Sequence, residues 1–510
     1  MKRFATALLL CALVLAGCNK KVLTPDDETD QQEQEQEQQQ QDAELLKTYR
    51  YVNTFAYNMM DLYYLWNAEI ATGLKGWKMT DDPVAKVKQI RYKDAAGDDI
   101  DRWTQVIDDY ESFYGSVSGE SSGTYGFDFI LMYFDSTHSQ LIAVVTYTYA
   151  GSPAQEAGLK RGDVIMKFND RTMTIDNYSE LVYDDIYGSK ALKLTLLDGT
   201  VVSMAAKEMY EDPVLLSKVF ESGDRKAGYL VYTGFTLDSY QALTEACRSF
   251  REAGITDLIL DLRYNGGGFS LAEQFLASLI APEEEVLAGS VLSTEVYNAD
   301  LTAYYKSRNY DTNTYFSTEY KFTVNNKDYA FSTKGANAKA GKLYAIVSSG
   351  TASASEALLC DLYPYMDITL IGEQTHGKYC SGLPLEAVDF YDDYADTLTE
   401  QGINPTLGKK YADNWGLYVM YGRFADKNGE TRCMPDGLAP DVEADDQPWE
   451  PYQLGDPQES MLSVALEQCG IKVPVTASRA SARVQAFEPV DVAPRRPGFG
   501  VYIGTEWMAK

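Results

Sequence analysis

From about residue 212 onward, short apolar segments alternate with longer segments of helical character, and this alternation limits the fold more than any other feature. Residues 256–263 and 343–348 are apolar runs of strand length, and 239–253 and 353–363 have the length and apolar spacing of helices. Alternation of this kind is typical of folds in which helices and a sheet form layers. We therefore predict an α/β core. Further strands are expected at 228–233 and 368–372, and further helices at 271–279 and 459–467.

The first residues have the pattern of a secretion signal. Lys2 and Arg3 precede an apolar run over residues 5–15, which is too short to span a bilayer as a mature helix. Residues 15–18, Leu-Ala-Gly-Cys, resemble a bacterial lipobox, which implies cleavage before Cys18 and attachment of lipid to its thiol. The alternative is an ordinary signal peptide in which Cys18 is incidental. The lipobox interpretation places the protein on a membrane of a bacterial cell envelope, at its periplasmic or cell-surface face.

Between Asp26 and Asp42 the chain is almost entirely Asp, Glu and Gln. This segment has almost nothing to bury, so its sequence predicts a disordered tether. The whole chain has a formal net charge of −30. Such a charge argues against nucleic acid and anionic lipid headgroups as partners, because both would repel it.

The few histidines and cysteines argue against a metal site. Only His138 and His376 occur, and there is no HExxH motif. The five cysteines after Cys18 form no metal-ligand spacing and are expected to be buried free thiols. These cysteines are Cys247, Cys360, Cys380, Cys433 and Cys469. We expect no metal and no cofactor.

Residues 152–165, SPAQEAGLKRGDVI, predict a short helix capped near Ser152, a turn and a strand. This stretch resembles PDZ domains, and Tyr125-Gly126-Phe127 resembles their carboxylate-binding loop. In PDZ domains a peptide adds as a strand to a sheet edge, and backbone N–H groups hold its terminal carboxylate. The alternative is a structural sheet domain without an open groove.

Ser353 lies in the segment SGTASASE, between a buried-type strand and a helix. A nucleophile at such a junction is held rigidly beside the positive end of the helix. The same residues also fit a capping box, in which Ser353 and Glu356 only satisfy free N–H groups. Local sequence does not separate these two interpretations.

Two further motifs supply partners for Ser353. Lys378 follows the strand at 368–372 and can approach Ser353 if this strand is the neighbour of 343–348; a buried neutral lysine can act as a general base. Gly266 and Gly267 follow the strand at 256–263, and their N–H groups together with that of Ala354 could bind a developing oxyanion.

The order of these motifs resembles the C-terminal processing, or tail-specific, peptidases of family S41. A PDZ-like domain is followed by DLRYNGGG, GTASASEAL and GEQTHGK. The resemblance implies a ClpP/crotonase-like α/β catalytic core, Ser353 as the nucleophile and Lys378 as its base. This sequence departs from the family pattern at three positions. The family usually has phenylalanine where His376 stands and glycine where Tyr379 stands. It often has a glutamine that orients the lysine where Gly382 stands. His376 is a rival base.

The resemblance implies a serine endopeptidase that cleaves envelope polypeptides recognised through their exposed C-termini. One alternative is a catalytically silent, PDZ-containing lipoprotein that binds peptides, and another is a crotonase-like acyl-transfer or hydratase enzyme. The predicted segments are a signal peptide (1–17), a lipidated cysteine with its tether (18–42), an N-terminal helical domain (43–118), a PDZ-like domain (119–209), the peptidase core (210–472) and a C-terminal tail (473–510).

Overall fold

A computed structural model describes residues 25–118, 123–187, 189–324, 327–472, 488–490 and 502–503. A mostly parallel sheet lies at the centre of the core, with its strands in the order β20-β17-β16-β10-β9-β8. Only β8, at one edge, runs antiparallel to its neighbour among these described strands. The bounds are β8 Val214–Ser222, β9 Arg225–Tyr232, β10 Asp257–Asp261, β16 Lys342–Val347, β17 Ile368–Gly372 and β20 Val442–Glu443. The predicted strands at 256–263, 343–348 and 368–372 are confirmed.

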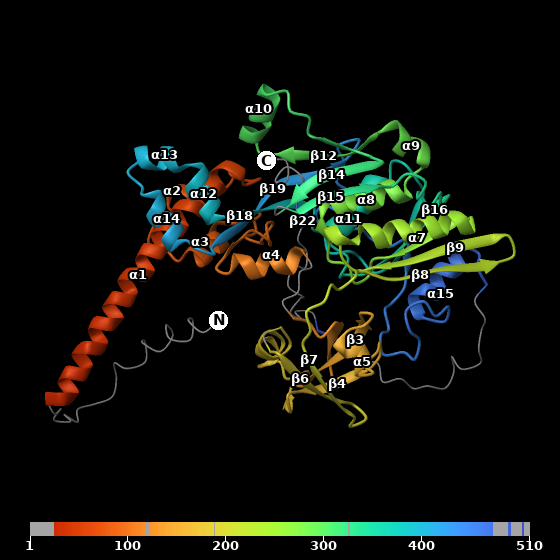
Figure 1. The fold of residues 1–510 in the computed structure, drawn as a ribbon, viewed down its shortest axis with the longest axis horizontal. Helices are drawn as coiled ribbons and strands as arrows, with labels where there is room; N and C mark the ends of the chain where they lie inside the picture. The colour runs from red at the N-terminus through yellow and green to blue at the C-terminus, as the bar shows by residue number, and fades with distance from the viewer. Residues whose placement is uncertain are drawn as a thin grey trace.

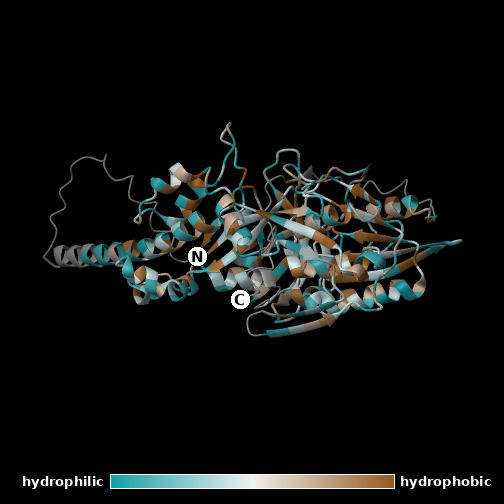
Figure 2. Ribbon diagram, turned by 90° about the horizontal axis from the view of Figure 1, so that it is seen from above, coloured by the Kyte–Doolittle hydropathy of each residue, from teal (hydrophilic) through white to brown (hydrophobic). Residues whose placement is uncertain are grey.

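Helices cover both faces of this sheet (Figure 1). Leu258 and Leu260 of β10 belong to the cluster that contains α7 and α11, whereas Ile259 belongs to the cluster that contains α15. This alternation follows from the twofold period of a strand. The helices are α7 Tyr240–Ala253, α8 Ser270–Ile280, α11 Ala354–Leu362 and α15 Ser460–Gln468. The end of the β8–β9 hairpin extends away from the core, and Figure 2 shows it as hydrophilic.

A second sheet packs against α11, whose residues are all buried. Its strands lie in the order β11-β22-β18-β19-β12-β13, and β1 also pairs with β19. The bounds are β11 Gly268–Phe269, β12 Val291–Tyr297, β13 Asn313–Tyr315, β18 Cys380–Glu386, β19 Gly416–Asp426 and β22 Tyr502–Ile503. Outside the two sheets lie α9 Glu283–Ala288, α10 Ala299–Ser307, the hairpin β14 Glu319–Val324 with β15 Lys327–Ser332, α12 Ala387–Asp393, α13 Ala395–Glu400 and α14 Pro405–Tyr411.

The predicted PDZ-like domain forms a separate small sheet with its own buried cluster. The strand order is β21-β2-β3-β4-β6-β7. Ser152 caps the short helix α5 by accepting the N–H of Gln155, as its sequence predicts. The bounds are β2 Phe127–Tyr133, β3 Leu141–Thr148, α5 Pro153–Glu156, β4 Val164–Phe168, β5 Arg171–Thr172, α6 Tyr178–Glu180, η1 Leu181–Tyr187, β6 Ala191–Leu196, β7 Val201–Ala205 and β21 Glu488–Pro489.

The hydrophobic core of the N-terminal segment is continuous with that of the α/β core. Helix α1 packs against α12, α14 and β19, and β1 (Gln105–Ile107) extends the second sheet. The helices are α1 Pro25–Tyr63, α2 Ala71–Lys75, α3 Pro83–Ile90 and α4 Tyr110–Ser118. The disordered tether predicted up to Asp42 is wrong from Pro25 onward, where the chain is helical. Glu and Gln favour helices, and the packed half of α1 supplies the nucleus for helix growth.

The predicted C-terminal tail contributes a strand to each of two sheets. β21 pairs with β2, and β22 pairs with β11 and β18. The signal peptide and Cys18 lie outside the described residues. Within the described chain, no helix is long and apolar enough to cross a membrane. The five cysteines after Cys18 are free and buried, as predicted.

A buried network of ion pairs joins the PDZ-like domain to the core. Arg161 contacts Asp446 at 2.7 Å and Glu459 at 3.3 Å. Arg263 pairs with Asp261 at 2.8 Å and with Glu459 at 2.6 Å. Burial alone would favour neutral acids, but the two guanidinium groups hold the pKa of both Asp446 and Glu459 below the ordinary value.

We expect Glu459→Gln to lower the free energy of unfolding by about 3 kcal/mol, because it leaves two buried cations with one acid fewer. The measurement is urea-induced unfolding followed by circular dichroism. Glu467→Gln, on the exposed face of the same helix α15, is the matched control and should change little. A loss as small as that of the control would show that the network contributes little to stability.

Candidate active site

Three predicted motifs lie at the carboxyl ends of neighbouring parallel strands. The Ser353 turn follows β16, the Lys378 loop follows β17, and the glycine loop over residues 266–268 follows β10. Because β17, β16 and β10 are adjacent and parallel, their carboxyl ends meet at one edge of the sheet. This edge is where ligands bind in open α/β sheets.

Ser353 occupies a strained turn at the start of α11. Its backbone has φ 62° and ψ −113°, a conformation that a residue with a side chain rarely adopts. The backbone N–H of Ser353 donates to Glu356 Oε2 at 2.9 Å, so Glu356 does cap the helix. The Ser353 hydroxyl meanwhile accepts a hydrogen bond from Lys378 Nζ at 3.2 Å. The capping and nucleophile interpretations are therefore compatible.

Lys378 is completely buried next to Ser353. Burial lowers the pKa of its amine from 10.5 to about 7, although the nearby acidic groups, Asp101 and Glu356 among them, oppose this shift. At neutral pH a large fraction of the amine is therefore unprotonated. A neutral amine in contact with a hydroxyl is what a general base requires.

Glu356 fixes the serine turn and the lysine loop relative to each other. Besides the Ser353 N–H, its carboxylate accepts hydrogen bonds from Gly377 N at 2.7 Å, Lys378 N at 2.9 Å and Thr375 Oγ1 at 2.5 Å. Burial raises the pKa of this carboxyl, and the four hydrogen bonds oppose that shift. The capping-box pattern predicted only a capping role for Glu356, so this second role was missed.

Hydrogen bonds to one backbone carbonyl hold the glycine loop against the serine turn. Ala352 N and Ser355 Oγ both donate to the carbonyl of Asn265, at 3.1 and 3.0 Å. A Cβ on Gly267 would lie 2.7 Å from the Cβ of Ser353, so only glycine lets the loop approach this closely.

The three predicted oxyanion donors differ in their hydrogen bonds. The N–H groups of Gly266 and Ala354 have no acceptor among the described residues. The N–H of Gly267 instead donates to Asn265 Oδ1 at 2.9 Å. In this structure the neighbouring amide side chain uses the Gly267 hydrogen, so its role as an oxyanion donor stays a prediction.

Tyr418 of β19 is a site residue that the sequence did not indicate. Lys378 Nζ donates to its hydroxyl at 3.2 Å, the same distance as to Ser353. The phenol ring fills the space beside Gly382, where any Cβ would collide with it. The only signal in the sequence was the glycine itself, which left open what occupies that space.

The N-terminal segment supplies part of the wall around Lys378. The Trp103 ring lies 5.8 Å from Nζ, and the Phe113 ring lies 5.6 Å from that of Tyr418. Apolar rings exclude water from the amine and so contribute to its lowered pKa. The backbone N–H of His376, the predicted rival base, donates to the Thr351 carbonyl at 3.0 Å and so ties the lysine loop to the serine turn.

The predicted carboxylate loop lies at the start of β2, which pairs with β3 on one side and with the two-residue strand β21 on the other. The Tyr125 hydroxyl donates to the Ser189 carbonyl at 2.7 Å, and the Gly126 N–H donates to Thr124 Oγ1 at 2.9 Å. Gly126 has φ 70° and packs against Ser152, where a Cβ would collide. Tyr125 and Gly126 thus shape the loop, but the Gly126 N–H is not open to a ligand here. Phe127 is the first residue of β2.

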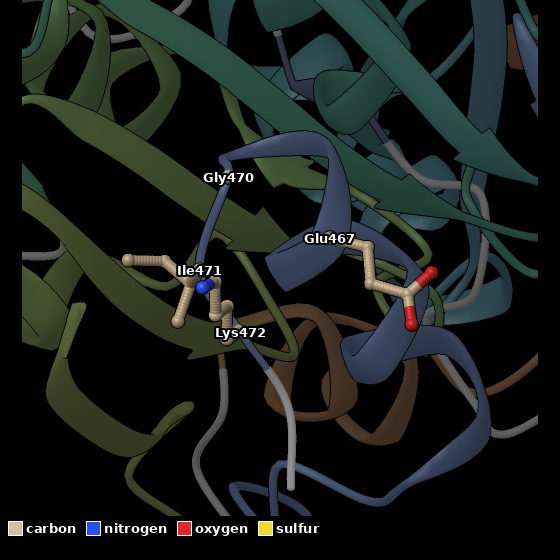
Figure 3. A pocket seen from close by; sticks show the side chains of 4 residues that line it. All are labelled: Glu467, Gly470, Ile471 and Lys472. Carbon is tan, nitrogen blue, oxygen red and sulfur yellow. The ribbon is translucent and has the colours of Figure 1, made fainter. Parts of the chain in front are cut away.

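A shallow hollow at the end of α15 contains none of these residues. Its lining consists of Glu467, Gly470, Ile471 and Lys472 (Figure 3). It has no nucleophile and no group that contacts Ser353 or Lys378. We therefore place the candidate site at the sheet edge rather than in this hollow.

The fold and the site have the features of an α/β hydrolytic protein in which a strained, buried serine is paired with a buried lysine. Comparison with known families agrees with this class. Residues 226–444 match Peptidase family S41, and residues 144–195 match the PDZ domain. The chain therefore carries an S41 peptidase domain together with a PDZ domain.

The curated relatives that the chain matches are named as C-terminal processing proteases. The carboxyl-terminal-processing protease of Synechocystis sp. is 29% identical over 239 residues, which are 45% of this chain and 48% of the relative. Carboxy-terminal processing protease CtpA of Bacillus subtilis is 28% identical over 230 residues, 45% of this chain and 42% of the relative. The chain thus spans about half the length of the curated relatives that it matches.

A solved structure confirms the fold. The putative S41 protease from Bacteroides fragilis superposes with a TM-score of 0.58 at 21% identity. The match covers 82% of this chain and 97% of that chain. The predicted fold, an α/β core preceded by a PDZ domain and an N-terminal helical segment, is confirmed at this level.

We expect Lys378→Met to be more stable than wild type at about pH 6, by at least about 1 kcal/mol. The folded chain holds this lysine at a pKa of about 7, against 10.5 when solvated, so a protonated Lys378 opposes folding. The free-energy cost of burying the protonated amine is at its full value below about pH 7. It decreases as the pH rises toward 10.5, because the unfolded state then also loses the proton.

The measurement is urea-induced unfolding at a series of pH values, with Lys75→Met on the surface as the control. A stability difference that does not depend on pH would show that Lys378 is not held neutral.

Proposed function

We propose that this chain is a serine endopeptidase of the C-terminal processing type. The observation that carries the proposal is the 3.2 Å hydrogen bond between Lys378 Nζ and Ser353 Oγ, in a site where the amine has a pKa of about 7. The S41 and PDZ matches and the names of the curated relatives support the same activity.

In the proposed mechanism Ser353 Oγ attacks the carbonyl carbon of a peptide bond while its proton moves to Lys378 Nζ. The carbonyl oxygen becomes an oxyanion, and the N–H groups of Gly266 and Ala354 are placed to donate to it. The ammonium of Lys378 then protonates the leaving amine as the C–N bond breaks. A water molecule, deprotonated by the same amine, hydrolyses the acyl-enzyme and restores the serine.

Tyr418 acts in this scheme as a positioning residue for Lys378. The amine contacts two hydroxyls at 3.2 Å, and the position of the Tyr418 hydroxyl on β19 fixes where Nζ lies. This is the part that an orienting glutamine would play at position 382. Tyr418 also accepts a hydrogen bond from the ammonium form, so it moderates the effect of burial on the lysine pKa.

The PDZ domain would select the substrate by its C-terminus, through strand addition at the β2 edge. The buried network links this domain to the glycine loop. Arg161 NH1 donates to the Tyr264 hydroxyl at 2.5 Å. Arg263 and Tyr264 lie three and two residues before Gly266 in the chain. We further propose that the chain is attached to a bacterial envelope membrane through lipid on Cys18, on the basis of the lipobox-like residues 15–18.

We expect Ser353→Ala to abolish cleavage of a disordered polypeptide with an apolar C-terminus, because no acyl-enzyme can form. Fragments would be identified by mass spectrometry, with Ser307→Ala on the exposed face of α10 as a control preparation. The wild-type rate should rise with pH through about 7, as the Lys378 amine loses its proton. Equal cleavage by Ser353→Ala would show a different nucleophile. Peptide binding without cleavage by wild type would favour the silent peptide-binding lipoprotein.

We expect Tyr418→Phe to lower the maximal rate about tenfold, because one hydrogen bond of about 1.4 kcal/mol no longer orients the amine. The midpoint of the pH–rate profile should also move to lower pH, since the ammonium form loses an acceptor. The control is Tyr344→Phe on β16, whose hydroxyl donates to the Gln468 carbonyl at 3.0 Å. A reduced rate with an unshifted midpoint would indicate a purely structural role for Tyr418.

A further inference from the structure

We propose that β21 and β22 are an intramolecular ligand, which occupies the two places where a polypeptide substrate would bind and so competes with it. This inference rests on the proposed function. It assigns a strand-binding slot between β11 and β18 and names the occupant of that slot in the resting protein.

β22 fills a gap one strand wide in the second sheet. Tyr502 pairs with Gly268 and Ile503 with Phe269 on one side, and Ile503 pairs with Gly382 on the other, all in parallel orientation. β11 and β18 are not paired with each other. The described backbone therefore joins these two strands only through β22, and Figure 1 shows β22 beside β18.

Both walls of this slot begin at the candidate active site. β11 starts at Gly268, directly after the glycine whose Cβ would lie 2.7 Å from that of Ser353. β18 starts at Cys380, two residues after Lys378. An extended chain paired to both walls therefore runs past the serine, which is the course that a substrate strand must take to present its backbone carbonyl.

β21 occupies the open edge of the PDZ sheet. β2 pairs with β3 on one side and with β21 on the other, where Met132 faces Pro489 and Tyr133 faces Glu488 in antiparallel register. The Val490 N–H donates to the Leu131 carbonyl at 3.2 Å, and the Val490 side chain is buried in the domain's own cluster. A peptide that binds by strand addition would need this same edge.

The two contacts explain why the occupant must be polypeptide and why it can be displaced. Both strand pairings are backbone contacts, to which β21 adds only the buried Val490 side chain next to it, so an extended chain of suitable sequence can replace them. Each strand is only two residues long, and a backbone hydrogen bond contributes about 0.5–1.5 kcal/mol net. A longer substrate strand can therefore compete successfully.

The test uses the full chain with Tyr502→Pro and Ile503→Pro, which removes two N–H donors from β22. We expect kcat/KM for the disordered polypeptide to rise about fivefold, because the competing strand no longer pairs. The matched control is Tyr502→Thr with Ile503→Val, which changes both side chains but keeps the N–H groups and a high strand propensity. It should behave like wild type.

A second measurement does not depend on proteolysis. In the Ser353→Ala background, amide hydrogen exchange at Gly268–Phe269 and Cys380–Gly382 should be faster with the two prolines than with the Thr/Val pair. If exchange is faster with the two prolines while no variant cleaves polypeptide, the result supports occupation of the slot by β22 and contradicts the proposed function. Unchanged exchange, or faster exchange with an unchanged cleavage rate in an active enzyme, overturns the competition proposed here.

Discussion

The buried amine of Lys378 is the constraint on which the rest of the catalytic region depends. A solvated lysine is protonated at neutral pH and cannot accept a proton, so the amine must be kept from water. The protein achieves this with side chains that are distant in sequence: Trp103 from the N-terminal segment, Tyr418 from the second sheet and the serine turn itself. The N-terminal segment therefore has to be continuous with the core, and its strand β1 is built into the same sheet as Tyr418.

A second requirement is that loops from different strands keep fixed positions at this buried site. The Glu356 carboxylate meets it by accepting hydrogen bonds from the Ser353 and Lys378 backbones together. Its four donors replace the water that it gave up on burial, which is the condition for keeping a charged group inside a protein. The carbonyl of Asn265 performs the corresponding task between the serine turn and the glycine loop.

The same physical device, addition of a strand to an unpaired edge, occurs at both ends of the proposed substrate path. Without β21 the PDZ sheet would end at β2, and without β22 the second sheet would have a gap between β11 and β18. Unpaired strand edges attract other chains, and a protein that exposes them must cover them or use them. Here β21 covers the edge of β2, and β22 fills the position between β11 and β18.

Local patterns in the sequence were sufficient for the elements and for the choice of Ser353 and Lys378 as the candidate pair. The apolar runs predicted β10, β16 and β17 because a strand buried on both faces needs a continuous apolar sequence, and the motifs beside them predicted Ser353 and Lys378. What a residue touches across the fold was not accessible in this way. The contact between the Tyr418 hydroxyl and Lys378 depends on residues far apart in the chain. The helical course of residues 25–42 depends on the packed helix that continues from them. Sequence periodicity records which way a side chain faces, whereas only the tertiary structure decides which group it meets there.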